Sequence, residues 1–238
     1  MRLDKWLAHA GLGTRNDVKA LIRQGRVRVN DTVIRQPDVH VNVDHDRVIC
    51  DDEAVRAPTR LVLMMHKPVG VVSARKDTRN RTVIECLPKP MQRRDLHIAG
   101  RLDKDASGLL ILTTDTALVH DIIAPKKHVY KTYDVVVDGR LPSREVFSKP
   151  RELKDGKNRP YTPHPPRIVR WEESAARVAV REGKFHQVKR MFKAAGAEVI
   201  ALKRVAIGNL ELGDLPEGAV RELVSQDIEA LLMSDKED

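Results

Sequence analysis

The chain has 238 residues, which is enough to bury a core in one or two domains, and its hydrophobic fraction of 41% is ordinary for a globular protein. Lys and Arg number 43 against 34 Asp and Glu, and the net charge of +9 indicates a polyanionic partner. The two cysteines match no zinc-binding spacing and exclude a disulfide scaffold, and the apolar runs are too short for a signal peptide or a bilayer span. We therefore expect a cytoplasmic protein that does not associate with membranes.

The positive charge is concentrated in two separate blocks. Residues 1–35 carry eight basic and three acidic side chains, and residues 177–204 carry eight basic and two acidic ones. Two blocks so far apart in the chain favour a long polyanion, such as a nucleic acid, over a small anionic ligand.

The first block has the pattern of a compact module. Apolar residues at helical spacing predict a helix over residues 3–10, and Thr14 is placed to cap a second helix over residues 15–24. The stretch 27–34 alternates apolar and polar residues around Asn30–Asp31, which predicts a short hairpin.

Basic residues are interleaved with these apolar positions, so several of them share an exposed face. A solvated helix face would explain this pattern without any function. Over residues 1–48, however, the stretches "RLDKWLA", "TRNDVKALI" and "GRVRVN" resemble the S-four-type RNA-binding module, first named for a ribosomal protein. The resemblance implies a small α/β domain that binds structured RNA through phosphate contacts from Arg2, Lys5, Arg15, Lys19, Arg23, Arg26 and Arg28.

Beyond this module, the acidic and turn-forming stretch "ICDDEAVRAPTR" is interpreted as a linker over residues 49–60. We expect a larger domain over residues 61–233 and a frayed tail over residues 234–238. Apolar runs predict strands within residues 60–74, 107–115, 131–139 and 174–183, and helical spacing predicts helices over 116–124 and 184–196. Because strands outnumber helices and connections are short, an α+β fold with a mixed, largely antiparallel sheet and flanking helices is favoured.

The two helices of this larger domain have identifiable features. Thr116 is placed to cap the first helix. The second helix is amphipathic, and its apolar stripe is formed by Phe185, Val188, Phe192 and Ala195.

The sequence lacks the motifs of several common kinds of binding site. The chain has neither a Walker-type phosphate loop nor a dinucleotide-binding fingerprint. His40, Asp44, His45 and Asp46 are potential metal ligands, but their spacing matches no familiar site. We expect no bound metal.

One acidic residue stands out as a candidate for catalysis. Asp103 lies in "AGRLDKDASGLLILTTD", residues 99–115, directly before a run that predicts a buried strand. An acid beside Arg101 in such a turn is usually a structural ion pair. A glycosidase that uses Asp103 and Asp105 together is a weaker alternative, because no further acid is marked as a partner.

Three stretches together resemble the cofactor-independent pseudouridine synthases. They are "GRLDKDASGL", "KTYDVVVDG" and "EGKFHQVKRMF", and with the amino-terminal module they cover nearly the whole chain. The sequences of these stretches are most similar to those of the branch that modifies small-subunit (16S) ribosomal RNA. The resemblance implies an enzyme that flips one uridine out of this RNA and isomerises it to pseudouridine without a cofactor.

The resemblance also implies roles for four residues. Asp103 is the nucleophile that attacks, or stabilises, the cationic sugar while the base is detached. Lys189 is expected beside it, because a neighbouring cation favours the ionised carboxylate in a dry site. Tyr133 packs against the target base, and Arg101 faces the space that the flipped uridine leaves. Without the resemblance, Tyr133 would be a core strand residue and Lys189 an exposed lysine.

The sequence departs from the family pattern near the nucleophile. Ala106 stands where the family usually has a threonine, and Thr114 and Thr116 replace an asparagine and a glycine. The missing hydroxyl removes a hydrogen bond of the loop, for which the neighbouring Ser107 is the expected substitute.

The expected partner is ribosomal RNA or a pre-ribosomal small-subunit particle, and the expected state is a monomer. Two alternatives stay open. The first is the same reaction on large-subunit (23S) RNA, since related branches also carry an S-four-type module. The second is a non-catalytic RNA-binding factor in ribosome assembly.

Overall fold

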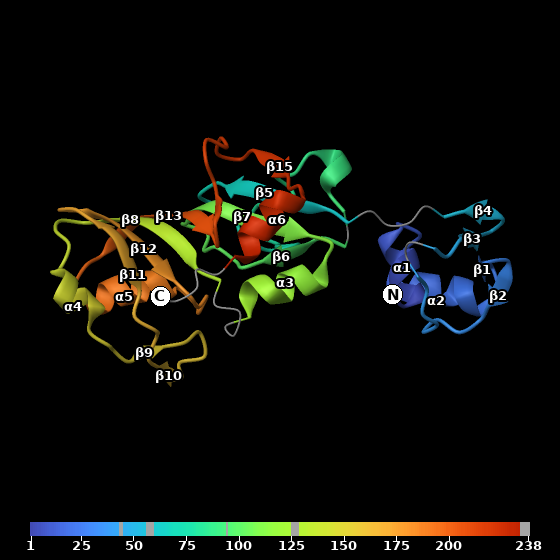
Figure 1. Cartoon of the computed structure of the whole chain (residues 1–238), viewed down its shortest axis with the longest axis horizontal. Helices are drawn as coiled ribbons and strands as arrows, with labels where there is room; N and C mark the ends of the chain where they lie inside the picture. The colour runs from blue at the N-terminus through green and yellow to red at the C-terminus, as the bar shows by residue number, and fades with distance from the viewer. Residues whose placement is uncertain (43–44, 56–59, 94, 125–128, 234–238) are drawn as a thin grey trace. The chain divides into compact units, whose positions relative to one another are not determined.

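The computed structural model describes residues 1–42, 45–55, 60–93, 95–124 and 129–233 (Figure 1). Asp44 and the predicted tail over residues 234–238 lie outside the described residues. The chain divides into two compact units, Met1–Arg60 with Arg93–Asp95, and Leu61–Gln92 with the chain from Leu96 onward.

The first unit consists of two helices and a small antiparallel sheet with the strand order β2-β1-β3-β4. Its elements are α1 (Leu3–His9), α2 (Arg15–Arg23), β1 (Val27–Val29), β2 (Thr32–Ile34), β3 (Val48–Cys50) and β4 (Glu53–Ala54). Both predicted helices and the predicted hairpin are confirmed. Thr14 caps α2 through its hydroxyl, and Asn30 and Asp31 form the hairpin turn with φ values of 47° and 67°.

The stretch 49–60 is not simply a linker, because it contains strands β3 and β4. Val48 to Cys50 are buried and pair with β1. Asp51 and Asp52, whose acidic character indicated a linker, form the tight turn between β3 and β4 in the left-handed conformation. The sequence pattern was misleading because the strand before the turn has only three residues.

The second unit is built on a sheet that has nine strands within the described residues, in the order β11-β12-β8-β13-β7-β5-β15 with β14 and β6 at the side. Its strands are β5 (Val62–Lys67), β6 (His97–Ala99), β7 (Ser107–Thr113), β8 (Lys131–Val137), β11 (Arg167–Trp171), β12 (Ala175–Val180), β13 (Val199–Ile207), β14 (Leu210–Glu211) and β15 (Val220–Glu222). Among these pairs only β13 with β7 is parallel. The predicted mixed, largely antiparallel sheet is therefore confirmed.

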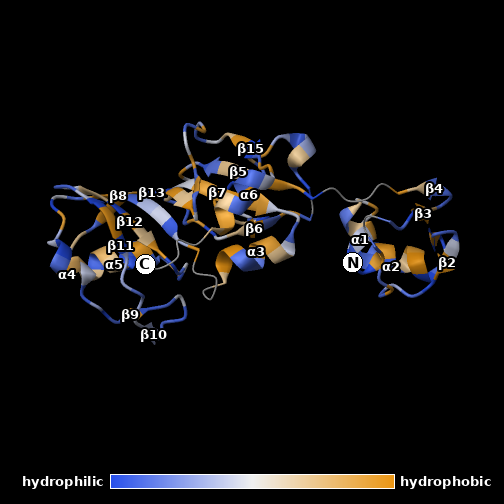
Figure 2. Ribbon diagram, in the orientation of Figure 1, coloured by the Kyte–Doolittle hydropathy of each residue, from blue (hydrophilic) through white to orange (hydrophobic). Residues whose placement is uncertain are grey.

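Helices flank this sheet, and a separate hairpin lies beside it (Figure 1). The remaining elements are η1 (Lys89–Met91), α3 (Thr116–Ile123), α4 (Arg144–Ser148), α5 (Gln187–Ala194), α6 (Ser225–Leu232) and the hairpin strands β9 (Leu153–Lys154) and β10 (Pro160–Tyr161). Strands β5 and β7 are buried along nearly their whole length, because successive side chains enter two different cores. One core includes α5 and the other includes α3 and α6, and Figure 2 shows the hydrophobic character of the central strands.

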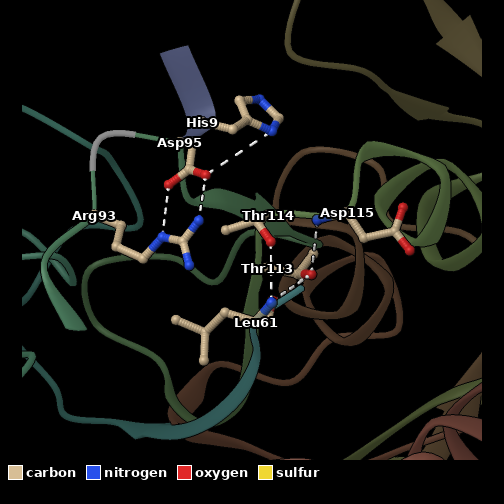
Figure 3. Close-up of polar contacts among 7 residues, drawn as sticks. All are labelled: His9, Leu61, Arg93, Asp95, Thr113, Thr114 and Asp115. Atoms are coloured by element: carbon tan, nitrogen blue, oxygen red, sulfur yellow. Dashed lines mark hydrogen bonds and ion pairs between the residues drawn. The ribbon is translucent and has the colours of Figure 1, made fainter. Parts of the chain in front are cut away.

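The cap of α3 differs from the prediction. Asp115, not Thr116, is the N-cap, and its carboxylate accepts hydrogen bonds from the amides of Ala117 and Leu118 at 2.9 and 3.1 Å. Thr114, which departs from the family pattern, accepts from the Leu61 amide through its hydroxyl at 3.0 Å (Figure 3). The hydroxyls around this turn therefore join the start of β5 to the end of β7.

Gly108 permits the close approach of the parallel strands β7 and β13. It pairs with Arg204, has a φ of +111°, and a Cβ placed on it would lie 2.2 Å from the Arg204 carbonyl oxygen. No side chain fits at this crossing without moving one strand.

We predict that Gly108→Ala lowers the free energy of unfolding by about 3 kcal/mol, because the methyl group meets backbone rather than a flexible side chain. Gly139→Ala is the matched control: its φ is +73°, nothing lies within 4 Å of the added Cβ, and the expected loss is about 1 kcal/mol. Urea unfolding of both variants measures the difference. Equal losses would contradict the close-approach explanation.

Candidate active site

Asp103 lies in the loop that connects β6 to β7. Leu102 and Ala106 on either side are buried, whereas the Asp103 side chain is 24% exposed. The apolar neighbours fix the loop to the core, and the carboxylate stays near the surface. The predicted strand directly after this loop is confirmed as β7.

Two buried side chains hold the backbone of this loop. The Ser73 hydroxyl donates to the Leu102 carbonyl at 2.7 Å and accepts from the Leu102 amide at 3.0 Å. The Lys67 ammonium donates to the carbonyls of Ala106 at 2.6 Å and Pro68 at 2.9 Å. In the described chain, the loop thus accepts side-chain hydrogen bonds from Ser73, from Lys67 and, at the Gly100 carbonyl, from Arg204, and the expected substitute Ser107 is not among these donors.

Lys67 was not identified from the sequence, although a charged residue at the end of an apolar run was a usable signal. It is fully buried at the end of β5. Burial lowers its pKa to about 8, and the charges of Asp103 and Asp105 oppose that shift. A cation is therefore held under the loop that carries both acids.

The partner of Asp103 is His186 and not Lys189. The imidazole Nε2 lies 3.3 Å from Asp103 Oδ1, whereas Lys189 Nζ lies 2.5 Å from Asp105 Oδ2. The predicted ion pair between Lys189 and Asp103 is therefore wrong. The reason is local: His186 stands directly before α5 with a φ of 49°, and the lysine lies further along the helix and contacts the second acid of the loop.

Asp105 consequently has a different environment from Asp103. The hydrogen bond from Lys189 lowers the pKa of the Asp105 carboxyl, and burial opposes that effect. Each acid of the loop thus has its own basic partner, which does not favour a glycosidase that uses both acids as one pair.

Phe185 is not part of the apolar stripe of α5, as its helical spacing predicted. The helix begins only at Gln187, and Phe185 is 52% exposed and stacks on the His186 ring with centroids 3.8 Å apart. Val188 and Phe192 are buried as predicted.

A cavity of about 440 Å³ opens beside Asp103. Its size is within the range of small-molecule sites, and its walls combine apolar side chains with a few polar ones. The polar side chains that line it include Arg101, Asp103, Lys131, Tyr133, His186 and Arg204. Lys189 is not among the lining residues.

Tyr133 forms part of the cavity wall and is 7% exposed. It pairs across the sheet with Arg204, and its hydroxyl lies 3.5 Å from Arg204 Nη1. Arg204 was counted in the second basic block, but it is 1% exposed. It alternates along β13 with the buried residues Leu202 and Ala206, so the period of two in this strand, which was not predicted, was a usable signal.

Lys131 is a second buried cation of the cavity wall. Its ammonium donates to the carbonyls of Ile122 at 3.0 Å and Val129 at 2.9 Å. Burial lowers its pKa to about 8, and the nearby charge of Arg204 adds to that shift. Arg101 is exposed at the edge of the cavity, and Asp103 is paired with His186 rather than with Arg101.

The basic residues of the first unit are distributed as the helical spacing predicted, but several are neutralised. Arg15, Lys19 and Arg23 follow one another at four-residue intervals along α2. The ion pairs that involve the predicted RNA contacts include Arg2 and Arg15 with Asp4, Arg26 with Asp51, and Arg28 with Asp52. Asp4 is fully buried, and although burial raises its pKa, the hydrogen bonds from both arginines lower it overall.

Within the described residues, no helix has the length and hydropathy needed to cross a membrane. In the same part of the chain, no group of three or more His, Cys, Asp or Glu side chains is arranged to hold a metal ion.

Comparisons with known proteins agree with this architecture. A family model for RNA pseudouridylate synthases matches residues 61–194, and the S4 domain model matches residues 1–48. A crystal structure of a pseudouridylate synthase aligns with a TM-score of 0.66 and 31% identity over 97% of this chain and 99% of that one.

Three curated relatives match along nearly their whole length. An uncharacterized RNA pseudouridine synthase of Bacillus subtilis (strain 168) is 39% identical, over 97% of this chain and 98% of its own. Ribosomal small subunit pseudouridine synthase A of Vibrio cholerae is 34% identical over 97% and 99%. Ribosomal large subunit pseudouridine synthase B of Bacillus subtilis is also 34% identical, over 97% and 95%.

The chain therefore belongs to the RNA pseudouridylate synthase family and carries an amino-terminal S4 domain. Its activity is the isomerisation of uridine to pseudouridine in RNA.

We predict that the buried lysines make stability rise with pH above about 8. The pKa of Lys131 is about 8 in the folded chain against 10.5 for an ordinary lysine, so between these values the unfolded chain binds more protons. Below pH 8 the lysine is protonated in both the folded and the unfolded chain, and the unfavourable contribution of the buried charge to the free energy of folding is fully present.

Lys131→Met should remove the share of this rise that comes from Lys131, which amounts to at most about 3 kcal/mol between pH 8 and 10.5. Urea unfolding of wild type and variant at pH 7.5 and pH 10 provides the measurement, and groups common to both proteins cancel in the difference. Lys67→Met should behave in the same way. A constant difference between wild type and variant at the two pH values would show that these lysines are not shifted.

Proposed function

We propose that this enzyme converts one uridine of small-subunit (16S) ribosomal RNA to pseudouridine, in free RNA or in an assembling small-subunit particle. It acts as a monomer in the cytoplasm, where ribosomal RNA is its partner. The relative named as a small subunit enzyme in Vibrio cholerae supports this substrate. The equally similar relative named as a large subunit enzyme makes 23S RNA the second candidate.

The observation that carries the catalytic proposal is the position of Asp103 at a cavity that also contains Tyr133. Pseudouridine formation breaks the bond between C1′ of the sugar and N1 of uracil and then joins C5 of uracil to the same C1′. Asp103 attacks, or stabilises, the cationic sugar, and the cavity holds the detached base against the ring of Tyr133. Both bonds belong to one nucleotide, so the reaction consumes no second substrate.

Lys189 was expected to contact Asp103, but His186 makes that contact and Lys189 contacts Asp105 instead. His186 contacts the nucleophile itself and orients its Oδ1 oxygen. Lys189 acts on the loop through Asp105 and is a positioning residue. The proposed catalytic residues are therefore Asp103 and Tyr133, and Lys189 acts on the Asp103 loop only through its contact with Asp105.

The target uridine has to leave its stack before its C1′ can reach Asp103, and this costs a few kcal/mol. Arg101, exposed at the edge of the cavity, fills the space left in the RNA with its planar guanidinium. Phosphate contacts from the S4 domain contribute binding energy and depend on salt. The proposed contacts are Arg2, Lys5, Arg15, Lys19, Arg23, Arg26 and Arg28.

We predict that Asp103→Asn abolishes turnover and leaves RNA affinity within about twofold of wild type, because the amide keeps the shape of the side chain but cannot act as a nucleophile. Release of tritium from RNA labelled at C5 of uridine measures turnover, and gel-shift titration measures affinity. Asp105→Asn is the comparison variant, and it should slow turnover without abolishing it. Retained turnover in Asp103→Asn would remove this residue from the nucleophile role.

The substrate prediction is tested in a strain that lacks the gene. Carbodiimide treatment followed by reverse transcription marks pseudouridines as stops in both ribosomal RNAs. We expect one stop to disappear from the 16S map and to return when the wild-type gene, but not the Asp103→Asn variant, is restored. Loss of a stop from the 23S map would instead establish the large-subunit alternative.

A further inference from the structure

Three cations are buried in or beside the active site. Lys67, Lys131 and Arg204 are 0%, 4% and 1% exposed. Within the described part of the chain, their hydrogen-bond partners are carbonyl oxygens and one tyrosine hydroxyl, and no carboxylate lies within 4 Å of them. Burial of a cation without an anionic partner is costly, so this concentration of positive charge needs an explanation.

Arg204 is the cation best placed to act on a ligand. Its Nε donates to the Leu109 carbonyl at 2.7 Å and its Nη2 donates to the Gly100 carbonyl at 2.7 Å, which fixes the plane of the guanidinium. Among the residues that the structure describes, the hydrogen-bond partner of Nη1 is the Tyr133 hydroxyl, at the long distance of 3.5 Å. Since Arg204 lines the cavity, Nη1 is the donor with capacity left for a bound molecule.

The acids of the cavity do not neutralise these cations directly. Asp103 contacts His186. Glu182, the other acid that lines the cavity, accepts from Gln187 at 2.9 Å and lies 3.8 Å from His164. The cavity is therefore preorganised for negative charge that arrives from outside the protein.

The proposed reaction brings such a charge. When the C1′–N1 bond breaks, its electron pair leaves with the base, and the detached uracil is an anion with charge on N1 and on its carbonyl oxygens. Asp103 balances the positive charge of the sugar but cannot stabilise this anion. Fixed donors aimed at developing charge in a water-poor site are among the largest contributions to catalysis.

We propose that Arg204 stabilises the detached uracil anion by donating a hydrogen bond from Nη1 to one of its carbonyl oxygens, with Lys131 adding a second positive charge from the same wall. The step balances: the electron pair of C1′–N1 moves to uracil while Asp103 holds C1′. C5 then bonds to C1′, Asp103 is released as a carboxylate, the C5 proton is lost to solvent, and N1 takes up a proton in its place. This role rests on the proposed function of Asp103 and its cavity.

The competing explanation is that Arg204 is a clamp that only joins β7, the Gly100 carbonyl and Tyr133. Variants that differ in charge, combined with substrates that differ in leaving-group stability, separate the two roles. A clamp is lost in both Arg204→Gln and Arg204→Lys, whereas the positive charge is lost only in Arg204→Gln.

The experiment uses the full chain and transcripts of both ribosomal RNAs, made with uridine or with 5-fluorouridine. Fluorine at C5 withdraws electron density and stabilises the uracil anion, so bond breaking depends less on a cation. Single-turnover formation of the carbon-linked nucleoside is followed by nuclease digestion and mass spectrometry, and each variant rate is divided by the wild-type rate on the same RNA. On 5-fluorouridine RNA the carbon-linked product keeps its fluorine, because fluorine cannot leave C5 as a cation, and it adds water across N1 and C6, so its mass is that of 5-fluorouridine plus one water. Arg177→Gln, which removes an arginine of the same sheet that pairs with Asp134 outside the cavity, is the control.

We expect Arg204→Gln to be about 100-fold slower than wild type on uridine RNA, the loss typical of one removed oxyanion donor. On 5-fluorouridine RNA the loss should shrink to about tenfold or less by the same reasoning. Arg204→Lys should lose less than Arg204→Gln on uridine RNA, and Arg177→Gln should match wild type on both.

Equal losses on the two RNAs, and equal losses in the two Arg204 variants, would overturn the proposal and leave the clamp. If Arg204→Gln does not fold, Arg204→Lys decides alone, because a displaced charge gives a smaller loss on 5-fluorouridine RNA and a lost clamp does not. A wild-type chain that forms no pseudouridine on either unmodified RNA would overturn the proposed function together with this inference. An active wild type with unaffected Arg204→Gln would overturn only the inference.

Discussion

The contact between β7 and β13 at Gly108 and Arg204 is the constraint on which the active site depends. Because Gly108 has no side chain, the two backbones approach closely and the strands run parallel at this point. The Arg204 side chain then donates hydrogen bonds to the Leu109 carbonyl on β7 and to the Gly100 carbonyl at the start of the loop that carries Asp103. Tyr133 is opposite on β8, so one crossing sets the positions of the loop, the tyrosine and the buried cation.

The charges of the site follow a consistent arrangement. Cations are buried and held by backbone carbonyls, whereas Asp103, the proposed nucleophile, is partly exposed and contacts an imidazole. A buried cation held by carbonyls keeps its position without being neutralised, so its field extends into the cavity. Lys67 likewise fixes the loop that carries Asp103, through the hydrogen bond from its ammonium to the Ala106 carbonyl. The structure thus separates Asp103, which we propose acts on the sugar, from the buried cations, which we propose act on the base.

The S4 domain shows a second use of paired charge. Asp4 is buried between Arg2 and Arg15, and the turn between β3 and β4 supplies Asp51 and Asp52 to Arg26 and Arg28. The aspartates hold the arginine side chains in defined directions, which would lower the entropy lost in the proposed phosphate contacts. They also reduce the net charge, so the proposed contacts would release fewer counterions from RNA than the count of basic residues indicates.

The sequence alone determined the helices α1, α2, α3 and α5, the first hairpin, the strands β5, β7, β8 and β12, the two-part organisation and the family, because apolar periodicity, caps and contiguous motifs are local properties. It also singled out Asp103 and Tyr133, which line the same cavity, as candidate site residues. Only the tertiary structure decided that His186 meets Asp103 while Lys189 meets Asp105, and that Lys67, Lys131 and Arg204 are buried. Those facts depend on how segments distant in sequence cross one another, because a local pattern indicates at most that a basic residue faces a core and not which distant carbonyl or carboxylate it contacts.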